Sequence, residues 1–235
     1  MNQIRGLLLA FVATILVTGV LAATPAEAGR YHPPQGGHFN VPRGGEKQYR
    51  IQSKVAAAIR HAPRGSLITI SVFSWDRKII ASEIIKARNR GVQVQILLND
   101  HQVTPAQRML HRRLGTNRWR DNFAYECRNG CRSRGENLHS KFFLFSRTGG
   151  ARNVVMTGSS NWNDEGLKGD EEIFLIKAPG AYKDYADNFN WMYRYRSNQV
   201  KYIPYGSARI SAGTSLMRYD PSTELKRFGP AWETG

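Results

Sequence analysis

Four polar residues in two short segments have the types and the spacing that phosphate chemistry requires. His139 and Lys141 are two residues apart. Ser159 and Asn161 repeat this spacing further along the chain. Side chains two residues apart project from the same face of a strand, so the two pairs are expected to meet at one site from neighbouring strands. An imidazole is a nucleophile, and the groups beside it can hydrogen-bond an anionic phosphate.

A pair of carboxylates follows these two segments. Glu171 is expected to accept the proton on the far imidazole nitrogen, which fixes the tautomer and supports the imidazolium. Glu172 is the rival for this role, because a one-residue shift in register moves its side chain to the same face. The spacing of Ile173 and Leu175 favours Glu171, since it keeps that carboxylate on the interior side. A solvated strand start is the other interpretation of the pair.

The segments His139-x-Lys141 and Gly158-Ser159-x-Asn161 resemble the signature of the phospholipase D superfamily: H-x-K, four residues, D, six residues, G-S-x-N. The resemblance covers about residues 46 to 195. It is closest to the small secreted nucleases that carry one copy of the motif. It implies a phospholipase D-like α/β sandwich and a metal-independent reaction through a phosphohistidine on His139. Lys141 and Asn161 would then hold the non-bridging oxygens, and Ser159 would donate to the phosphate or the imidazole.

Two features depart from the family signature. Ser146 stands at the position of the aspartate, and eleven residues rather than six separate it from Gly158. We interpret the additional residues, with Thr148-Gly149-Gly150 among them, as a longer turn between two strands. Strand alternation predicts that Ser146 faces away from Lys141, so its role is expected to be structural.

A single motif copy supplies one histidine, although the leaving oxygen also needs a proton. We therefore expect a homodimer in which each chain contributes its His139 to a shared site. His61, His101 and His111 are the alternatives within one chain. His111 lies among helix cations and His101 lies just after a strand, so both are expected to be ordinary surface residues.

Basic residues are concentrated in the stretch that runs from the third expected helix to His139. They are Arg108, Arg112, Arg113, Arg118, Arg120, Arg128, Arg132 and Arg134. Trp119 and Tyr125 are interleaved with them, as in a groove that follows a phosphate backbone while aromatic rings contact bases or sugars. A solvated basic face with Trp119 in the core is the alternative.

The whole chain is also basic, with 34 Lys and Arg residues, 18 Asp and Glu residues and a net charge of +16. Such a balance favours polyanionic partners, and solubility alone is the alternative interpretation. Together with the motif it predicts a nuclease. A phospholipase D acting on phosphatidyl head groups would use the same chemistry and is the alternative. A non-catalytic polyanion-binding module is a third hypothesis, which Ser146 motivates.

Residues 1–28 have the features of an export signal. Arg5 precedes an apolar stretch from Gly6 to Ala23, and Ala26-Glu27-Ala28 is typical of a cleavage site. The apolar stretch is short and interrupted, so we expect a secreted protein without a transmembrane anchor.

Cys127 and Cys131 are the only two cysteines. In an exported protein a pair this close is expected to form a disulfide. A metal site is the alternative, but it would need further ligands nearby, so we expect no metal and no other cofactor.

Periodicity and composition predict the elements that carry these residues. Residues 29–45 predict a flexible leader, residues 46–196 one catalytic domain, and residues 197–235 an extension with a weak pattern. Helices are expected at 46–61, 77–90, 104–115 and 181–195, and strands at 67–73, 92–98, 122–126, 141–145, 153–156 and 171–176. This order predicts an α/β fold with a mixed β-sheet flanked by helices.

Overall fold

The computed structural model describes residues 30–128, 130–131, 136–169, 172–177, 179–194, 209–212 and 215–218. Its strands are β1 (Gly36–Phe39), β2 (Leu67–Val72), β3 (Gln93–Asn99), β4 (Phe123–Cys127), β5 (Phe142–Thr148), β6 (Ala151–Gly158), β7 (Glu172–Lys177), β8 (Arg209–Ala212) and β9 (Ser215–Arg218). Its helices are η1 (Gly45–Tyr49), α2 (Arg50–Arg60), α3 (Lys78–Asn89), α4 (Pro105–Leu114), α5 (Asp164–Lys168) and α6 (Pro179–Arg194).

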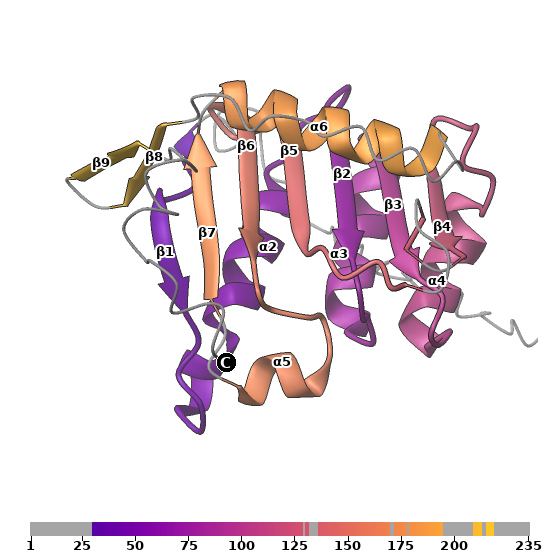
Figure 1. The fold of residues 1–235 in the computed structure, drawn as a ribbon, viewed down its shortest axis with the longest axis horizontal. Helices are drawn as coiled ribbons and strands as arrows, with labels where there is room; N and C mark the ends of the chain where they lie inside the picture. Colours follow the sequence, from indigo (N-terminus) through magenta and orange to yellow (C-terminus); the bar gives the residue numbers. More distant parts are fainter. Residues whose placement is uncertain are drawn as a thin grey trace, which may run out of the picture.

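Seven of the strands form one sheet in the order β1-β7-β6-β5-β2-β3-β4 (Figure 1). β2, β3 and β4 are parallel, whereas every other pairing in this sheet is antiparallel. The predicted mixed sheet is therefore confirmed. The C-terminal ends of β2, β3 and β4 lie at the same edge as the start of β5 and the end of β6. We call this the site edge, and the other end of these strands the opposite edge.

Helices cover both faces of the sheet. α2, α3 and α4 lie on one face, and α6 crosses the other (Figure 1). Ile51, Val55 and Ile59 of α2 are buried in the first layer, as their helical spacing predicts. Phe142 of β5 and Phe189 of α6 are buried in the second layer. Each such side chain contributes about 1.5–3 kcal/mol through burial, so both layers hold the sheet that positions the site.

α4 begins and ends at the predicted residues. Thr104 is the N-cap, and its hydroxyl accepts a hydrogen bond from the Gln107 N–H at 3.2 Å. The Gln107 side chain accepts from the Thr104 N–H in return, which completes a capping box. Gly115 ends the helix with φ 80°, in the region that favours glycine. The capping box fixes the start of α4 close to the site edge.

The flexible leader was predicted wrongly in part, because residues 36–39 form β1. This strand pairs antiparallel with β7, with Gly36 opposite Leu175. It is short and rich in glycine, so its own sequence has no clear alternation, and its partner comes from far along the chain. The buried Asn40 then fixes the segment, since it donates to Gly166 O at 3.1 Å and accepts from Ile51 N–H at 3.2 Å. The short α5 and the β8–β9 hairpin were not predicted either.

The predicted longer turn between β5 and β6 is wrong, because the additional residues extend the two strands: Thr148 pairs with Ala151, and only Gly149 and Gly150 form the turn. Gly149 lies in the turn with φ 55°. Ser146 lies near this turn, at the opposite edge, and its Oγ accepts a hydrogen bond from Leu67 N–H at 2.8 Å. Ser146 therefore helps to hold the start of β2, which is a structural role away from Lys141.

Candidate active site

The motif residues lie in loops at the site edge and not on the strands themselves. β5 begins one residue after Lys141, and β6 ends one residue before Ser159. The prediction that both pairs project from strands is therefore wrong in detail. The pairs lie off the strands because each segment leaves the sheet to form other hydrogen bonds. Residues 138–140 bond to β2 and β3, and residue 162 bonds to the end of β2.

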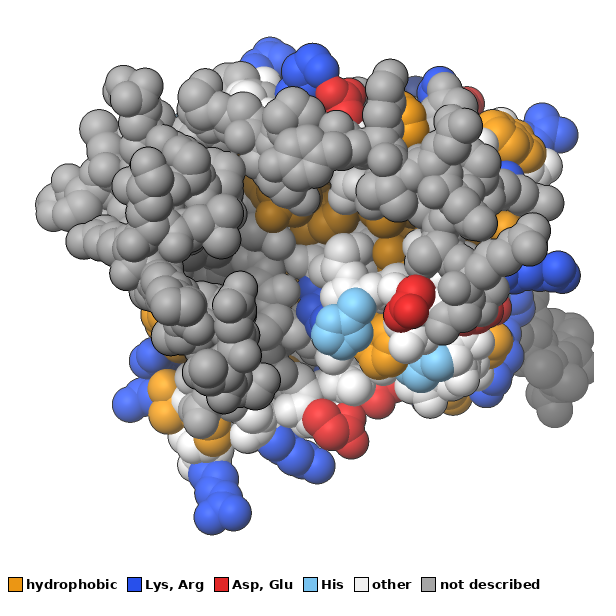
Figure 2. Space-filling view, viewed as in Figure 1, with side chains coloured by type: hydrophobic (Ala, Val, Ile, Leu, Met, Phe, Trp, Pro, Cys, Tyr) orange, Lys and Arg blue, Asp and Glu red, His pale blue; other side chains and the backbone are white. Residues whose placement is uncertain are grey.

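A cleft of about 440 Å³ opens beside these loops. It is lined by His139, Ser140, Lys141, Phe142, Thr157, Gly158, Ser159, Tyr185 and Asn188. The Tyr185 hydroxyl donates to Thr157 Oγ1 at 3.3 Å, which joins α6 to the wall of the cleft. Histidine side chains, in pale blue, are visible on this open face (Figure 2). Three motif residues therefore share one solvent-accessible cleft, whereas Asn161 is not among the lining residues.

The lysine ammonium lies against the histidine ring. Lys141 Nζ is 3.2 Å from Nδ1 and 3.3 Å from Nε2 of the exposed His139. It also donates to His139 O at 2.8 Å, which holds the two side chains together. Burial and then the Lys141 charge lower the pKa of His139. The imidazole is thereby favoured in the neutral form, in which a nitrogen lone pair can attack an electrophile.

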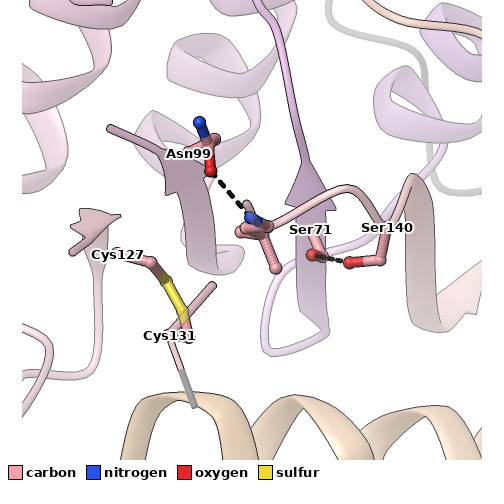
Figure 3. Close-up of a disulfide and its surroundings, with 6 residues drawn as sticks. Ser71, Asn99, Cys127, Cys131 and Ser140 are labelled. Atoms are coloured by element: carbon pink, nitrogen blue, oxygen red, sulfur yellow. Dashed lines mark hydrogen bonds between the residues drawn. A yellow bond between two sulfur atoms is a disulfide. The ribbon is translucent and has the colours of Figure 1, made fainter. Parts of the chain in front are cut away.

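Hydrogen bonds to β2 and β3 fix the segment that carries His139 (Figure 3). The Leu138 N–H donates to Oδ1 of Asn99 at 2.7 Å, and the Ser140 and Ser71 hydroxyls are 2.5 Å apart. Asn99 and Ser71 are fully buried near the C-terminal ends of their strands. Sequence reasoning missed both residues. Asn99, as the polar last residue of a buried strand, carries a recognisable signal, whereas Ser71 lies inside β2 and carries none.

The Cys127–Cys131 disulfide is present and lies beside this segment (Figure 3). Cys127 ends β4 and stands opposite Asn99 in the β3–β4 register. It is buried in the same hydrophobic cluster as Leu138. The cross-link therefore belongs to the support of the His139 segment.

The segment after β6 is held against the end of β2. The Trp162 N–H donates to Ser74 O at 3.0 Å. The Trp162 carbonyl accepts from Asp76 N–H at 2.7 Å and from Arg77 N–H at 3.0 Å. Trp75 and Trp162 are both buried. These bonds fix residues 159–163 beside the cleft.

α5 packs closely behind Asn161. Asn163 caps this helix by accepting from Gly166 N–H at 2.9 Å. A Cβ atom on Gly166 would lie 2.3 Å from the carbonyl oxygen of Asn161, so only glycine fits there. Among the described residues, Asn161 Oδ1 is buried and has no hydrogen-bond partner. Leaving a buried amide oxygen unsatisfied costs about 1–3 kcal/mol and is the kind of feature retained at a functional site.

The carboxylate predicted to pair with the histidine is not tested. Glu171 lies outside the described residues. Glu172 is the first residue of β7 and stands opposite Phe39, at the site edge. The choice between the two glutamates stays a prediction.

Of the three alternative histidines, only His101 is near His139. His61 bonds to Ala57 O through Nδ1 at 2.8 Å, and its carbonyl accepts from Gly149 N–H at the opposite edge. His111 is half-buried on α4, with Nε2 at 3.5 Å from Glu126 Oε1. Burial lowers the pKa of His111 and raises that of Glu126, so burial opposes both of the charged forms that an ion pair needs.

Among the described residues, the arginines do not form the single groove that the sequence predicted. The β3–α4–β4 crossover carries the chain from the site edge to the opposite edge and back, which separates residues that are close in sequence. Arg108 and Arg128 are exposed near the site edge, whereas the exposed Arg112 and Arg113 lie in the last turn of α4. Arg132 and Arg134 lie outside the described residues. Lys and Arg side chains, in blue, lie around the rim of the visible face (Figure 2).

Arg118, Trp119 and Arg120 lie before β4 and thus at the opposite edge. Arg118 is only 7% exposed, with its guanidinium 4.9 Å from the Trp119 ring centroid and 5.0 Å from that of Tyr125. Arg118 is therefore a buried cation–π partner and does not line a groove. Trp119 is 64% exposed, so the alternative interpretation, which placed it in the core, is wrong as well.

In the described part of the chain, no group of three or more His, Cys, Asp or Glu side chains is arranged to hold a metal ion. No helix there is long and apolar enough to cross a membrane.

A family model described as cardiolipin synthase, PLD-like domain, matches residues 55–193, which is more than half of the chain. Nuc from Salmonella typhimurium, described as a phospholipase D family member, is similar in structure, with 17% identity, a TM-score of 0.46 and coverage of 66% of this chain and 91% of that chain. NucT from Helicobacter pylori has 15% identity, a TM-score of 0.48 and coverage of 66% and 94%. Polyphosphate kinase from Porphyromonas gingivalis has 12% identity, a TM-score of 0.40 and coverage of 83% and 28%. No curated protein sequence matches the chain. The match over residues 55–193, which include all four motif residues, shows that the chain belongs to the PLD-like domain family of the phospholipase D superfamily.

Proposed function

We propose that the protein is a secreted, metal-independent phosphodiesterase that cleaves nucleic acid through a phosphohistidine intermediate. The observation that carries this proposal is the contact of 3.2 Å between Lys141 Nζ and Nδ1 of His139 in an open cleft. The net charge of +16 supports a polyanionic substrate. The export pattern of residues 1–28 supports secretion.

The reaction would proceed in two displacements at phosphorus. In the first, a nitrogen of His139 forms a bond to phosphorus while the bond to the leaving oxygen breaks, and that oxygen takes up a proton. In the second, water attacks the phosphohistidine and releases the imidazole. Lys141, Ser159 and Asn161 would hold the non-bridging oxygens. Removal of one such preorganised donor typically costs on the order of 10²- to 10³-fold in rate.

We also propose the homodimer that a single motif requires. The second His139 would protonate the leaving oxygen across the symmetry axis, and His139 is exposed at the site edge where a second copy can approach. Light scattering should therefore give twice the mass of the chain. Specific activity should fall on dilution below the dissociation constant of the dimer. Full activity of a monomer would contradict the shared site.

The acidic limb of the pH profile of kcat/KM should reflect the titration of His139. His139 must be neutral to attack, so kcat/KM rises as pH increases through its pKa. Burial and the Lys141 charge lower that pKa, and we expect the limb below the ordinary value of 6.5. Lys141→Gln removes the cation, so the limb should move to higher pH while the rate falls. The assay is hydrolysis of bis-p-nitrophenyl phosphate across the acidic range, and a wild-type limb above the ordinary value would contradict the assignment.

Phospholipase D activity is the second candidate, and exposed apolar side chains at the site edge favour it. Phe39, Ile79 and Val103 are 62%, 53% and 42% exposed, and each lies next to a strand end or helix start at this edge. Exposed apolar residues that flank a cleft can contact a lipid surface.

The two candidates are distinguished by incubating the protein with plasmid, RNA and phosphatidylcholine vesicles, each with and without EDTA. We expect nucleic-acid cleavage that EDTA does not reduce. Efficient release of choline with intact nucleic acid would replace the nuclease by the phospholipase. Loss of all hydrolysis in EDTA, restored by Mg²⁺, would exclude the metal-independent mechanism.

A further inference from the structure

A second imidazole lies at the site edge, beside the first. His101 lies two residues after the last residue of β3 and stacks on Phe73, with ring centroids 4.2 Å apart and ring planes at 2°. His139 contacts the same Phe73 ring, with centroids 4.9 Å apart. One phenyl ring at the end of β2 thus positions both histidines. His101 is exposed, so a substrate bound at His139 can reach it.

The hydrogen bonds of Asn99 determine the tautomer of His101. Asn99 Oδ1 accepts from the Leu138 N–H, a group that can only donate, so the orientation of the carboxamide is defined. Its Nδ2 then faces His101 Nδ1 at 3.0 Å. An amide NH₂ only donates, so Nδ1 must accept with its lone pair. In the neutral ring the proton is therefore on Nε2, which has no hydrogen-bond partner among the described residues.

This contact makes His101 a poor proton donor to a leaving group. Protonation would place an Nδ1–H against the Asn99 N–H, with no acceptor between them. Burial lowers the pKa of His101 in the same direction, and only the neighbouring Asp100 charge opposes this. The Lys141 ammonium also lies near the Phe73 ring on which His101 stacks. His101 is thus a neutral donor through Nε2 and does not fit the role of the second acid.

We propose that His101 binds the polymeric substrate, donating its Nε2–H to a non-bridging oxygen of the phosphodiester next to the one that is cleaved. This inference rests on the proposed function. A phosphate oxygen is a strong acceptor, and a donor of fixed tautomer binds it at every pH at which the ring is neutral. The residue adds no charge to the contact, unlike Arg128, which lies exposed near the same edge.

Binding measured without turnover tests this role. Fluorescence anisotropy with a labelled single-stranded oligonucleotide compares His139→Ala with the double variant His139→Ala/His101→Ala. We expect the double variant to bind about tenfold more weakly, the effect of one lost hydrogen bond to a charged group. His101→Gln in the same background keeps a donor and should restore part of the affinity. Because no cation is lost, the slope of log Kd against log salt should not change.

Two matched variants serve as controls. Arg128→Ala should lower the salt slope by roughly 0.7, the effect of one phosphate contact on a single strand. His32→Ala should change neither affinity nor slope, because the exposed His32 is next to Tyr31, whose carbonyl accepts from Gly150 N–H at the opposite edge.

Three results would overturn the inference. The first is an unchanged affinity in the double variant. The second is a reduced salt slope, which would mean that His101 binds as a cation. The third is loss of the basic limb of the pH–rate profile in His101→Ala, which would make His101 the proton donor. The proposed function is tested separately by wild-type hydrolysis of bis-p-nitrophenyl phosphate. If that fails, the binding comparison still decides the role of His101.

Discussion

Replacing His139 by alanine should lower phosphodiester turnover by on the order of 10⁴-fold or more, because the covalent route loses its nucleophile. The side chain is exposed, and its loss removes no core contact. The circular dichroism spectrum and the melting temperature should therefore match those of the wild type. Initial rates with bis-p-nitrophenyl phosphate and with plasmid measure the effect.

The phosphohistidine intermediate offers a second test of the role of His139. Acid-labile phosphoryl transfer to the wild-type chain should be detectable by mass spectrometry after rapid quenching at neutral to basic pH. It should be absent from His139→Ala. Turnover by the alanine variant within tenfold of the wild type would show that another residue is the nucleophile.

Gly166→Ala should damage the site although residue 166 does not line the cleft. The new Cβ would lie 2.3 Å from Asn161 O, so the segment that carries Ser159 and Asn161 must move. We expect a loss of about 1–3 kcal/mol in the free energy of unfolding, as for other overpacked sites. Turnover should fall by on the order of 10²-fold, since small displacements of positioned groups have effects of that size.

Gly180→Ala is the matched control for this variant. Gly180 lies in the first turn of α6, and a Cβ atom there would meet nothing within 4 Å. Its melting temperature should equal or exceed that of the wild type, because alanine favours the helix. Equal behaviour of the two variants would show that the contact with Asn161 does not constrain the site.

The local rules of the sequence predicted most of the elements and part of the site. The Thr104 N-cap, the Gly115 stop and the buried spacing in α2 each depend on residues a few positions apart. The motif predicted a shared site for His139, Lys141, Ser159 and Asn161, and the first three line the cleft. Each of these predictions depended on short-range geometry that a linear pattern records.

The remaining features depend on how distant segments meet. The sequence marks Asn99 as a polar residue at a strand end, but only the fold shows that it supports the segment before β5. The run from Arg108 to Arg134 looked continuous, yet the α4 crossover divides it between two edges of the sheet. Topology, and not residue type, decided both outcomes.

The pairing of β1 with β7 also constrains the order in which the molecule can assemble. Gly36 and Leu175 are partners although nearly the whole described chain separates them. Such a pairing has a large loop-closure entropy and raises the contact order. During synthesis β1 cannot pair until β7 has emerged. The strand that comes first in the sequence therefore joins the sheet late. A nascent chain that stops before residue 172 would have the motif residues but not the pairing that closes this side of the sheet.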